Sequence, residues 1–221
     1  MRYTISASEL FNDLCNKIRR LELEPGSMIS ENEISELYNV SRSTVRTAFS
    51  KLEQINLICR FPQIGTFINT FDLDYIDSAL HIRNLVEMYI VEIVINLEDK
   101  TELIKSLEEN IELQVTFRGA KDYETGFSKV DSKFHNIIIS SSGRSKMMEI
   151  IHDSFIHIAR WKYFDIKYRN KINRLIDDHI EIFEAIKRCD VDMAKKALTK
   201  HLLTVDDDFV SYAKRNYPNY F

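Results

Sequence analysis

The sequence has few of the residues that make tight turns, since its 221 residues include only five glycines and three prolines. An all-β fold needs a turn after each short strand, and such turns depend on glycine and proline. Hydrophobic residues make up 44% of the chain and charged residues 29%, which is the balance of a globular protein. The composition therefore favours a mostly helical, folded chain.

Cysteine is also scarce. Cys15, Cys59 and Cys189 are odd in number and widely separated, which excludes a disulfide scaffold and a cysteine-rich metal site. No run of about 18 apolar residues could cross a membrane, and no N-terminal apolar segment precedes a cleavage site. We expect a cytoplasmic protein with no membrane partner.

An excess of positive charge is missing as well, because the formal net charge is −4. Residues 1–70 contain eight lysines and arginines against eight acidic residues. Within them, residues 42–60 hold four basic side chains against Glu53 alone. Any contact with nucleic acid would therefore depend on this local basic face and not on bulk charge.

The first 70 residues predict three helices and a hairpin. Apolar residues at helical spacing predict a helix over 6–23. The string "SENE" at 30–33 opens a second helix, and Ser41 caps a third whose apolar stripe runs from Val45 to Leu52. The run "LICRFPQIGTFI", with Pro62 and Gly65 between β-prone segments, predicts a hairpin.

Two helices joined by a short turn are typical of a helix-turn-helix, whose second helix enters the major groove of DNA. Arg42 and Arg46 lie one turn apart near the start of that helix. Arginine can donate two hydrogen bonds to guanine, and hydroxyl groups reach phosphates or base edges. The alternative is an ordinary solvated helix face. The hairpin, with Arg60 and Gln63 beside Gly65, favours a winged helix.

The remainder of the chain, residues 71–221, predicts an all-α antiparallel bundle of about six helices. The helical patterns run over 74–98, 100–118, 122–141, 144–163, 168–188 and 190–213. We place the boundary between the two domains near residues 70–73, where "NTFDLD" ends the hairpin.

Four ionisable residues of the helical part are predicted to point inward. Asp131 and His135 are four residues apart and so share a helix face. His179 and His201 fall on the apolar stripes of two later helices. Each could be a hydrogen-bonded core residue, but an Asp/His₃ set also suits a divalent metal, with Zn²⁺ foremost and Ni²⁺, Mn²⁺ or Fe²⁺ as alternatives.

The string "LEPGSMISENEISELYNVSRSTVRTAFSKLEQINLI" with "QIGTFI" resembles the winged-helix domain of GntR-family bacterial transcriptional regulators. The resemblance implies that operator DNA is contacted by the entrance of the third helix and by the wing: Ser41, Arg42, Ser43, Thr44, Arg46, Arg60, Gln63 and Gly65. Asn32 stands where some members carry a further arginine.

Residues 74–213 resemble the FCD-type ligand-binding domain of the FadR branch, in its six-helix, VanR-like group. The resemblance implies that Asp131, His135, His179 and His201 bind a divalent metal at the base of an effector pocket. Arg83 would then bind the carboxylate of a small effector, and Glu87 and Arg144 are further candidate contacts. The spacing of Arg83 and Glu87 is equally explained by an internal ion pair.

These features together predict a homodimeric, ligand-responsive regulator, expected to be a repressor. Two alternatives stay open. One is a metal-dependent enzyme with an Asp/His₃ site, for which only Glu87 offers a general base. The other is a regulator for which the metal itself is the signal.

Overall fold

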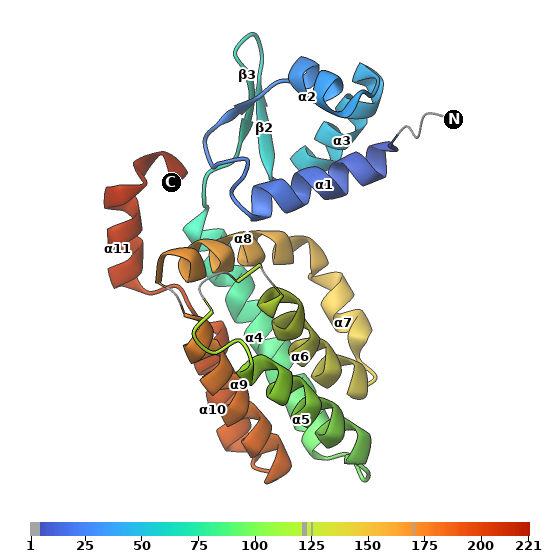
Figure 1. Ribbon diagram of the computed structural model, residues 1–221, viewed down its shortest axis with the longest axis vertical. Coiled ribbons are helices and arrows are strands. Elements are labelled where there is room, and N and C mark those ends of the chain that lie inside the picture. Colours follow the sequence, from blue (N-terminus) through green and yellow to red (C-terminus); the bar gives the residue numbers. More distant parts are fainter. Residues whose placement is uncertain (1–4, 121–122, 125, 170) are drawn as a thin grey trace. The chain divides into compact units, whose positions relative to one another are not determined.

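A computed structural model describes residues 5–120, 123–124, 126–169 and 171–221 (Figure 1). The chain divides into two compact units. The first unit consists of Met1–Ile76, Asp153–Trp161 and Val205–Phe221, and the second consists of Asp77–His152 and Lys162–Thr204. Within the described ranges, no helix has both the length and the apolar character needed to span a membrane.

The first unit contains the predicted helices and hairpin. Its elements are α1 (Ala7–Arg19), β1 (Met28–Ile29), α2 (Glu31–Tyr38), α3 (Arg42–Gln54), β2 (Ile58–Phe61), β3 (Gly65–Ile68), α11 (Asp207–Asn216) and the 3₁₀ helix η1 (Pro218–Tyr220). The strands form an antiparallel sheet in the order β1-β3-β2. The short strand β1 was not predicted; it pairs Met28 with Phe67 and adds a third strand to the hairpin.

Side-chain caps fix the helix starts in the first unit. Ser6 and Glu9 form a reciprocal capping box at α1, an arrangement typical of the string "SASE" at residues 6–9. Ser30 and Ser41 cap α2 and α3. Asn39 ends α2 in the left-handed conformation, at φ 50° and ψ 47°, which asparagine tolerates better than most residues. These local choices define the tight turn between α2 and α3.

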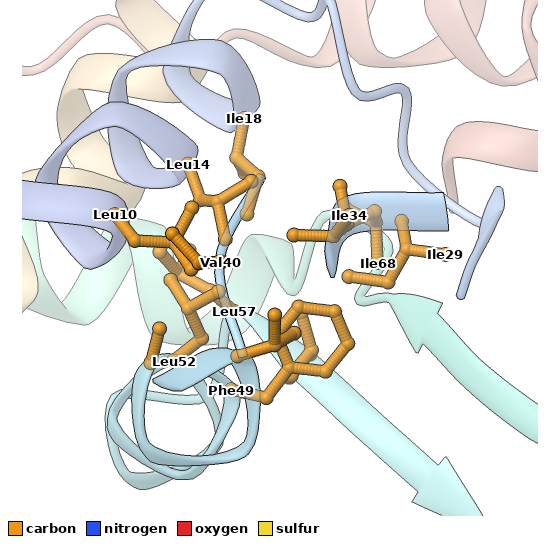
Figure 2. Close-up of a cluster of buried hydrophobic side chains, with 13 residues drawn as sticks. Leu10, Leu14, Ile18, Ile29, Ile34, Val40, Phe49, Leu52, Leu57 and Ile68 are labelled. Atoms are coloured by element: carbon orange, nitrogen blue, oxygen red, sulfur yellow. The ribbon is translucent and has the colours of Figure 1, made fainter. Parts of the chain in front are cut away.

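The core of this unit joins α1, α3 and the sheet (Figure 2). Leu10, Leu14 and Ile18 form one face of α1 and are fully buried. They pack with apolar residues of α3 and the sheet, such as Phe49 and Ile68. Each buried side chain contributes about 1.5–3 kcal/mol of transfer free energy, so this cluster holds α3 on a rigid support.

The C-terminal segment completes the first unit. The Phe71 backbone N–H donates to the Tyr220 carbonyl oxygen at 2.7 Å. Gly26 lies against the same segment, since a Cβ built on it would be 2.6 Å from the Asn219 carbonyl oxygen. Gly26 also has φ +76°. Glycine is therefore required here both by the backbone conformation and by the close approach.

Replacing Gly26 by alanine should destabilise the protein for two reasons. The left-handed backbone conformation costs an alanine about 1–2 kcal/mol, and the new methyl group also clashes with the Asn219 carbonyl oxygen, so the total loss should exceed that figure. The shift of the urea unfolding midpoint measures this. Gly119→Ala is the matched control: Gly119 has φ +82° but nothing within 4 Å of its Cβ position. A Gly26→Ala shift no larger than that of Gly119→Ala would refute the contact with Asn219.

The second unit is helical. The helices that follow the sheet are α4 (Leu73–Ile95), α5 (Thr101–Val115), α6 (Phe127–Ser141), α7 (Ser145–Ile150), α8 (His152–Arg169), α9 (Ile172–Lys187) and α10 (Val191–Leu202). The start of α4, up to Ile76, and the Asp153–Trp161 part of α8 belong to the first unit. In this unit α5 packs against α6 and α9, and α9 packs against α10. This confirms the mostly helical fold class, with a winged helix-turn-helix followed by helices.

Two of the six predicted helical patterns are each divided in the structure. The fourth pattern becomes α7 and α8, with a break at Ile151. The sixth becomes α10 and α11, because Leu203 leaves the helical conformation and Asp206 starts a new helix as its N-cap. Residue 122, the predicted start of the third pattern, and residue 170, within the fifth, lie outside the described residues.

Candidate functional site

The second unit brings together the four residues of the predicted metal site. Asp131 and His135 come from α6, His179 from α9 and His201 from α10, and all four are buried. His201 Nε2 lies 3.1 Å from His135 Nε2 and 3.2 Å from His179 Nε2. One ligand atom from each of the four lies within 4.8 Å of the others. Three imidazole nitrogens thus converge on one point beside a carboxylate.

The outward nitrogen of His135 faces an ion pair on α4. His135 Nδ1 lies 2.9 Å from Glu87 Oε2, and Arg83 Nε donates to Glu87 Oε1 at 2.5 Å. Burial alone would raise the pKa of Glu87, but the charge of Arg83 and the hydrogen bond from His135 outweigh it and hold that pKa well below its usual range. An ionised carboxylate only accepts hydrogen bonds, so Nδ1 carries the proton and Nε2 of His135 presents a lone pair.

The outward nitrogen of His179 is fixed by a chain of amides on α5. Asn110 Nδ2 donates to the Val130 carbonyl oxygen, which leaves Asn110 Oδ1 to accept from Gln114 Nε2 at 2.7 Å. Gln114 Oε1 must then accept, and it lies 2.7 Å from His179 Nδ1. The proton of His179 is therefore on Nδ1, and its Nε2 also presents a lone pair.

His201 provides the third Nε2 atom, but within the described part of the chain its outer nitrogen lacks the hydrogen bond that the outer nitrogens of His135 and His179 make. Its Nδ1 is buried and has no hydrogen-bond partner among the described residues. The nearest carboxylate oxygen recorded for it is Asp178 Oδ2, at 3.8 Å. Asp178 is itself buried and accepts from Lys200 Nζ at 3.0 Å. Asp178 therefore stands where the outer partner of a ligating histidine is commonly found.

The two short contacts between the three Nε2 atoms cannot both be hydrogen bonds. His201 Nε2 can direct at most one hydrogen towards either of two lone pairs, so one short nitrogen–nitrogen contact stays repulsive. A cation between the nitrogens removes this conflict. Tetrahedral zinc with bonds of about 2.0–2.1 Å places its donor atoms roughly 3.3 Å apart, close to the observed separations. The donor set therefore fits a divalent metal.

Burial keeps the imidazoles in the form that a metal needs. Desolvation, with His201 beside it, holds the pKa of His179 well below its ordinary value. Desolvation and the neighbouring His135 and Lys162 do the same for the pKa of His201. Both rings are therefore neutral near pH 7, and a metal would not have to displace a second proton from either ring.

Asp131 is held by residues outside the predicted set. Lys162 Nζ donates to both carboxylate oxygens, at 2.8 and 2.7 Å, and the Tyr123 hydroxyl donates to Oδ2 at 3.0 Å. Burial opposes ionisation of Asp131, but the charge of Lys162 outweighs it and lowers the pKa of Asp131 well below its usual range. Asp131 Oδ1 lies 3.9 Å from His179 Nε2. The Asp131 carboxylate thus lies at the site, and the Lys162 ammonium group is already bonded to both of its oxygens.

The candidate effector contacts differ in their surroundings. Arg83 and Glu87 form the internal i,i+4 pair, and Glu87 joins this pair to His135. Arg144 is exposed at the residue that precedes α7.

In the first unit, the predicted DNA contacts gather at the entrance of α3. Arg42, Ser43 and Arg46 are exposed there. The Ser41 hydroxyl accepts from the Thr44 backbone N–H at 3.1 Å, so Ser41 also has a structural role as the cap. Arg46 Nε donates to Glu31 Oε2 at 2.9 Å. A DNA base would have to compete with Glu31 for this guanidinium group.

The predicted wing residues lie on the β2–β3 hairpin. Arg60 is half-buried and its Nε lies 3.4 Å from Glu53 Oε2. Gln63 is exposed at φ 64° in the turn, and Gly65 follows at φ 148°. Phe61 and Ile64 expose apolar side chains beside them. The hairpin tip is therefore a mixed polar and apolar surface.

Sequence reasoning missed several partners of the candidate ligands: Gln114, Asn110, Asp178, Lys162 and Tyr123. For the two amides a signal was available, because they continue the apolar stripe of Leu103 and Leu107 at helical spacing. A polar residue on a buried stripe indicates a buried hydrogen bond.

Comparison with known proteins decides the family. Residues 6–68 match the description "Bacterial regulatory proteins, gntR family", and residues 78–204, more than half of the chain, match the FCD domain. The chain is a GntR-family regulator with an FCD domain. The α2–α3 pair thus belongs to the GntR helix-turn-helix, and the four convergent side chains lie within the FCD domain.

Named relatives of this GntR-family chain are transcriptional regulators. It is 24% identical over 208 residues to the HTH-type transcriptional repressor RspR of Escherichia coli K12, covering 94% of this chain and 90% of the relative. It is 27% identical over 182 residues to the gluconate operon transcriptional repressor of Bacillus licheniformis, covering 80% and 73%. The solved structure of E. coli McbR/YncC has the same fold, with a TM-score of 0.71 at 17% identity over 96% of this chain and 98% of that one. The two relatives matched by sequence are thus both named as transcriptional repressors.

Proposed function

We propose that this GntR-family regulator holds a divalent metal, zinc foremost, in its FCD domain and responds there to a small carboxylate effector. Asp131, His135, His179 and His201 would hold the metal. Residues 1–70 would read operator DNA in the cytoplasm, and residues 71–221 would bind the effector and dimerise. The naming of relatives such as RspR as repressors supports a repressor.

The main support for the proposal is that three imidazole Nε2 atoms converge. His201 Nε2 lies 3.1 Å from His135 Nε2 and 3.2 Å from His179 Nε2. Glu87 and Gln114 contact the outer nitrogens of His135 and His179 and orient these two rings towards a common centre. Asp178 Oδ2 lies 3.8 Å from the outer nitrogen of His201. When bound, a divalent metal would supply a positive, Lewis-acidic position that attracts the oxygens of a small acid. Among the candidate effector contacts, Arg83 is the cation linked to this centre through Glu87, which supports a carboxylate as the effector. Arg144 stays a candidate contact.

The proposed operator contacts rest on α3 and the wing. Arg42 and Arg46 project from the first two turns of α3, where a recognition helix meets base edges. Ser43 and Thr44 offer hydroxyl groups beside them, and Gly65 lets the hairpin backbone approach DNA closely.

A homodimer would place two such helices on the half-sites of a palindromic operator. An exposed apolar stripe on α4 supports this assembly. Ile82, Leu85 and Tyr89 are spaced by three and four residues and so share a face, and they are 50%, 67% and 48% exposed. A helix that is apolar on its outer face as well usually meets a partner. We propose that this stripe contributes to the dimer interface.

Replacing Leu85 by glutamate should shift the dimer towards monomer, because a buried unpaired charge at an interface is costly. Sedimentation velocity over a range of protein concentrations measures the shift, which we expect to be at least about tenfold in the dimer dissociation constant, or about 1.4 kcal/mol. Ile150→Glu, at a side chain that is 85% exposed on α7, is the control and should leave the dimer intact. An unchanged dimer in Leu85→Glu would rule out this face.

Operator affinity tests the proposed function. Metal-free and zinc-loaded protein would be titrated with operator DNA, with and without each member of a panel of small carboxylic acids. An acid sensor changes operator affinity only when both zinc and the right acid are present, since a ligand shifts an equilibrium only through its differential affinity. A change with zinc alone indicates that the metal is the signal. No sequence-specific DNA binding under any condition would refute both.

A further inference from the structure

The helix α8 places a lysine inside the candidate metal site. The Lys162 side chain is 19% exposed and its Nζ bonds to both oxygens of Asp131, whose side chain is 4% exposed. Both groups belong to the second unit, as do the three histidines. Among the four candidate ligands Asp131 is the carboxylate, so Lys162 holds the anionic ligand of the set.

An ammonium group and a divalent cation are alternatives at this carboxylate. Both are attracted by the same negative charge, and two cations at one carboxylate repel each other strongly in a buried site. Lys162 reaches both oxygens of Asp131, and Tyr123 occupies Oδ2 as well. A metal between the imidazoles would therefore need an oxygen on which Lys162 now donates.

The local charges are already balanced without a metal. Asp131 and Glu87 supply two negative charges, and Lys162 and Arg83 supply two positive ones. With neutral imidazoles, adding a divalent metal would leave the buried cluster with an excess of two positive charges. Buried excess charge is costly, so the loaded site favours either the departure of Lys162 or the arrival of an anion.

The structure offers Lys162 a second contact. Its Nζ lies 5.7 Å from the centre of the Tyr123 ring, within the range in which a cation is attracted to an aromatic face. The partly exposed lysine can thus leave Asp131 without becoming a buried charge that lacks any partner.

We propose that Lys162 is an internal competitor for the metal: it occupies Asp131 in the metal-free protein and must leave that carboxylate when a metal binds. The released ammonium then becomes a partner for the carboxylate of the effector, which links metal affinity to the presence of an anion. This rests on the proposed metal site and adds to it a residue that sets metal affinity and favours anionic effectors.

Zinc affinity of Lys162→Met tests the competition. In titrations against a chromophoric chelator, we expect Lys162→Met to bind zinc about tenfold more tightly than the wild type, a change of the size that outer-shell substitutions produce. The metal-free variant should also melt at a lower temperature, because Asp131 loses its counter-ion. A merely structural role for Lys162 would lower the melting temperature and the zinc affinity together. Equal or weaker zinc binding by Lys162→Met would overturn the proposal.

Two further variants test whether the change in zinc affinity depends on the charge of Lys162 and on its position. Lys162→Arg keeps the charge and should stay within about threefold of the wild type, or less than 1 kcal/mol. Lys167→Met is the matched control on the same helix, since Lys167 is exposed and its Nζ lies 5.9 and 5.6 Å from the Tyr163 and Tyr168 ring centres. It should leave zinc affinity unchanged.

Acetate serves as the probe for the anion. Acetate should tighten zinc binding by the wild type more than by Lys162→Met, because the variant lacks the released ammonium. An equal effect on both proteins would refute the anion-binding role.

Zinc binding by Lys162→Met but not by the wild type would uphold the competition in its strongest form. If neither protein binds zinc, the proposed metal site fails together with this inference; if the wild type binds zinc and the variant binds it no better, only the role of Lys162 fails.

Discussion

His179→Ala should lose its metal and its effector response while it keeps a folded, operator-binding first unit. His179 is fully buried, and its Nε2 is one of the three nitrogens that face the common centre. Loss of a direct ligand should weaken zinc binding by more than about a hundredfold, the upper range for loss of an outer-shell partner. Elemental analysis after dialysis gives the metal content, and operator titration gives the response.

His81→Ala is the matched control for this substitution. His81 is an exposed histidine on α4 and is near Asp77. Its removal takes away one imidazole without touching the centre, so metal content should stay at the wild-type level. Retention of stoichiometric zinc by His179→Ala would show that this ring is not a ligand.

Arg46→Ala should show the opposite pattern, with weaker operator binding and unchanged metal content. A base-reading arginine contributes about 1–3 kcal/mol. The measured loss also includes the competition with Glu31, to which Arg46 donates in the DNA-free protein. Operator titrations at several salt concentrations, with mutated half-sites, measure the loss of affinity and of base preference.

Lys51→Ala separates base reading from general loss of charge. Lys51 is in the last turn of α3, and its Nζ lies 5.9 Å from the centre of the Phe11 ring. It carries the same charge as Arg46 but lies away from the entrance of the helix. We expect a smaller effect that is uniform across operator sequences. Equal losses of affinity and base preference in both variants would contradict a base-reading role for Arg46.

His179→Ala and Arg46→Ala together test whether DNA reading and ligand sensing belong to separate parts of the chain. His179→Ala and Arg46→Ala lie in different compact units and different family matches. If both variants lose the same property to the same extent, DNA reading and ligand sensing do not belong to separate parts of the chain.

Short-range chemistry made the first unit predictable. Ser6, Ser30 and Ser41 cap helices through bonds that span two or three residues, so the sequence itself records where these helices start. In the same way, helical periodicity placed Asp131 and His135 on one face and put His179 and His201 on apolar stripes. All four residues are buried in the structure, as the periodicity indicates, and one ligand atom of each lies within 4.8 Å of the others.

Long-range contacts could not be predicted in this way. Lys162 meets Asp131 across 31 positions of sequence, and Gln114 meets His179 across 65. The strand β1 pairs with β3, with Met28 opposite Phe67, so its partner is also distant in the sequence. For Arg83 and Glu87 the sequence left an ion pair and an effector contact equally open. The structure contains the ion pair and also connects Glu87 to His135.

Three imidazole nitrogens and one carboxylate oxygen are proposed to surround a single metal. X-ray absorption at the zinc edge of the loaded protein tests this coordination. We expect a first shell of nitrogen and oxygen at about 2.0–2.1 Å, with outer-ring scattering from three imidazoles. A first shell containing sulfur, or scattering from fewer than three imidazoles, would contradict this coordination.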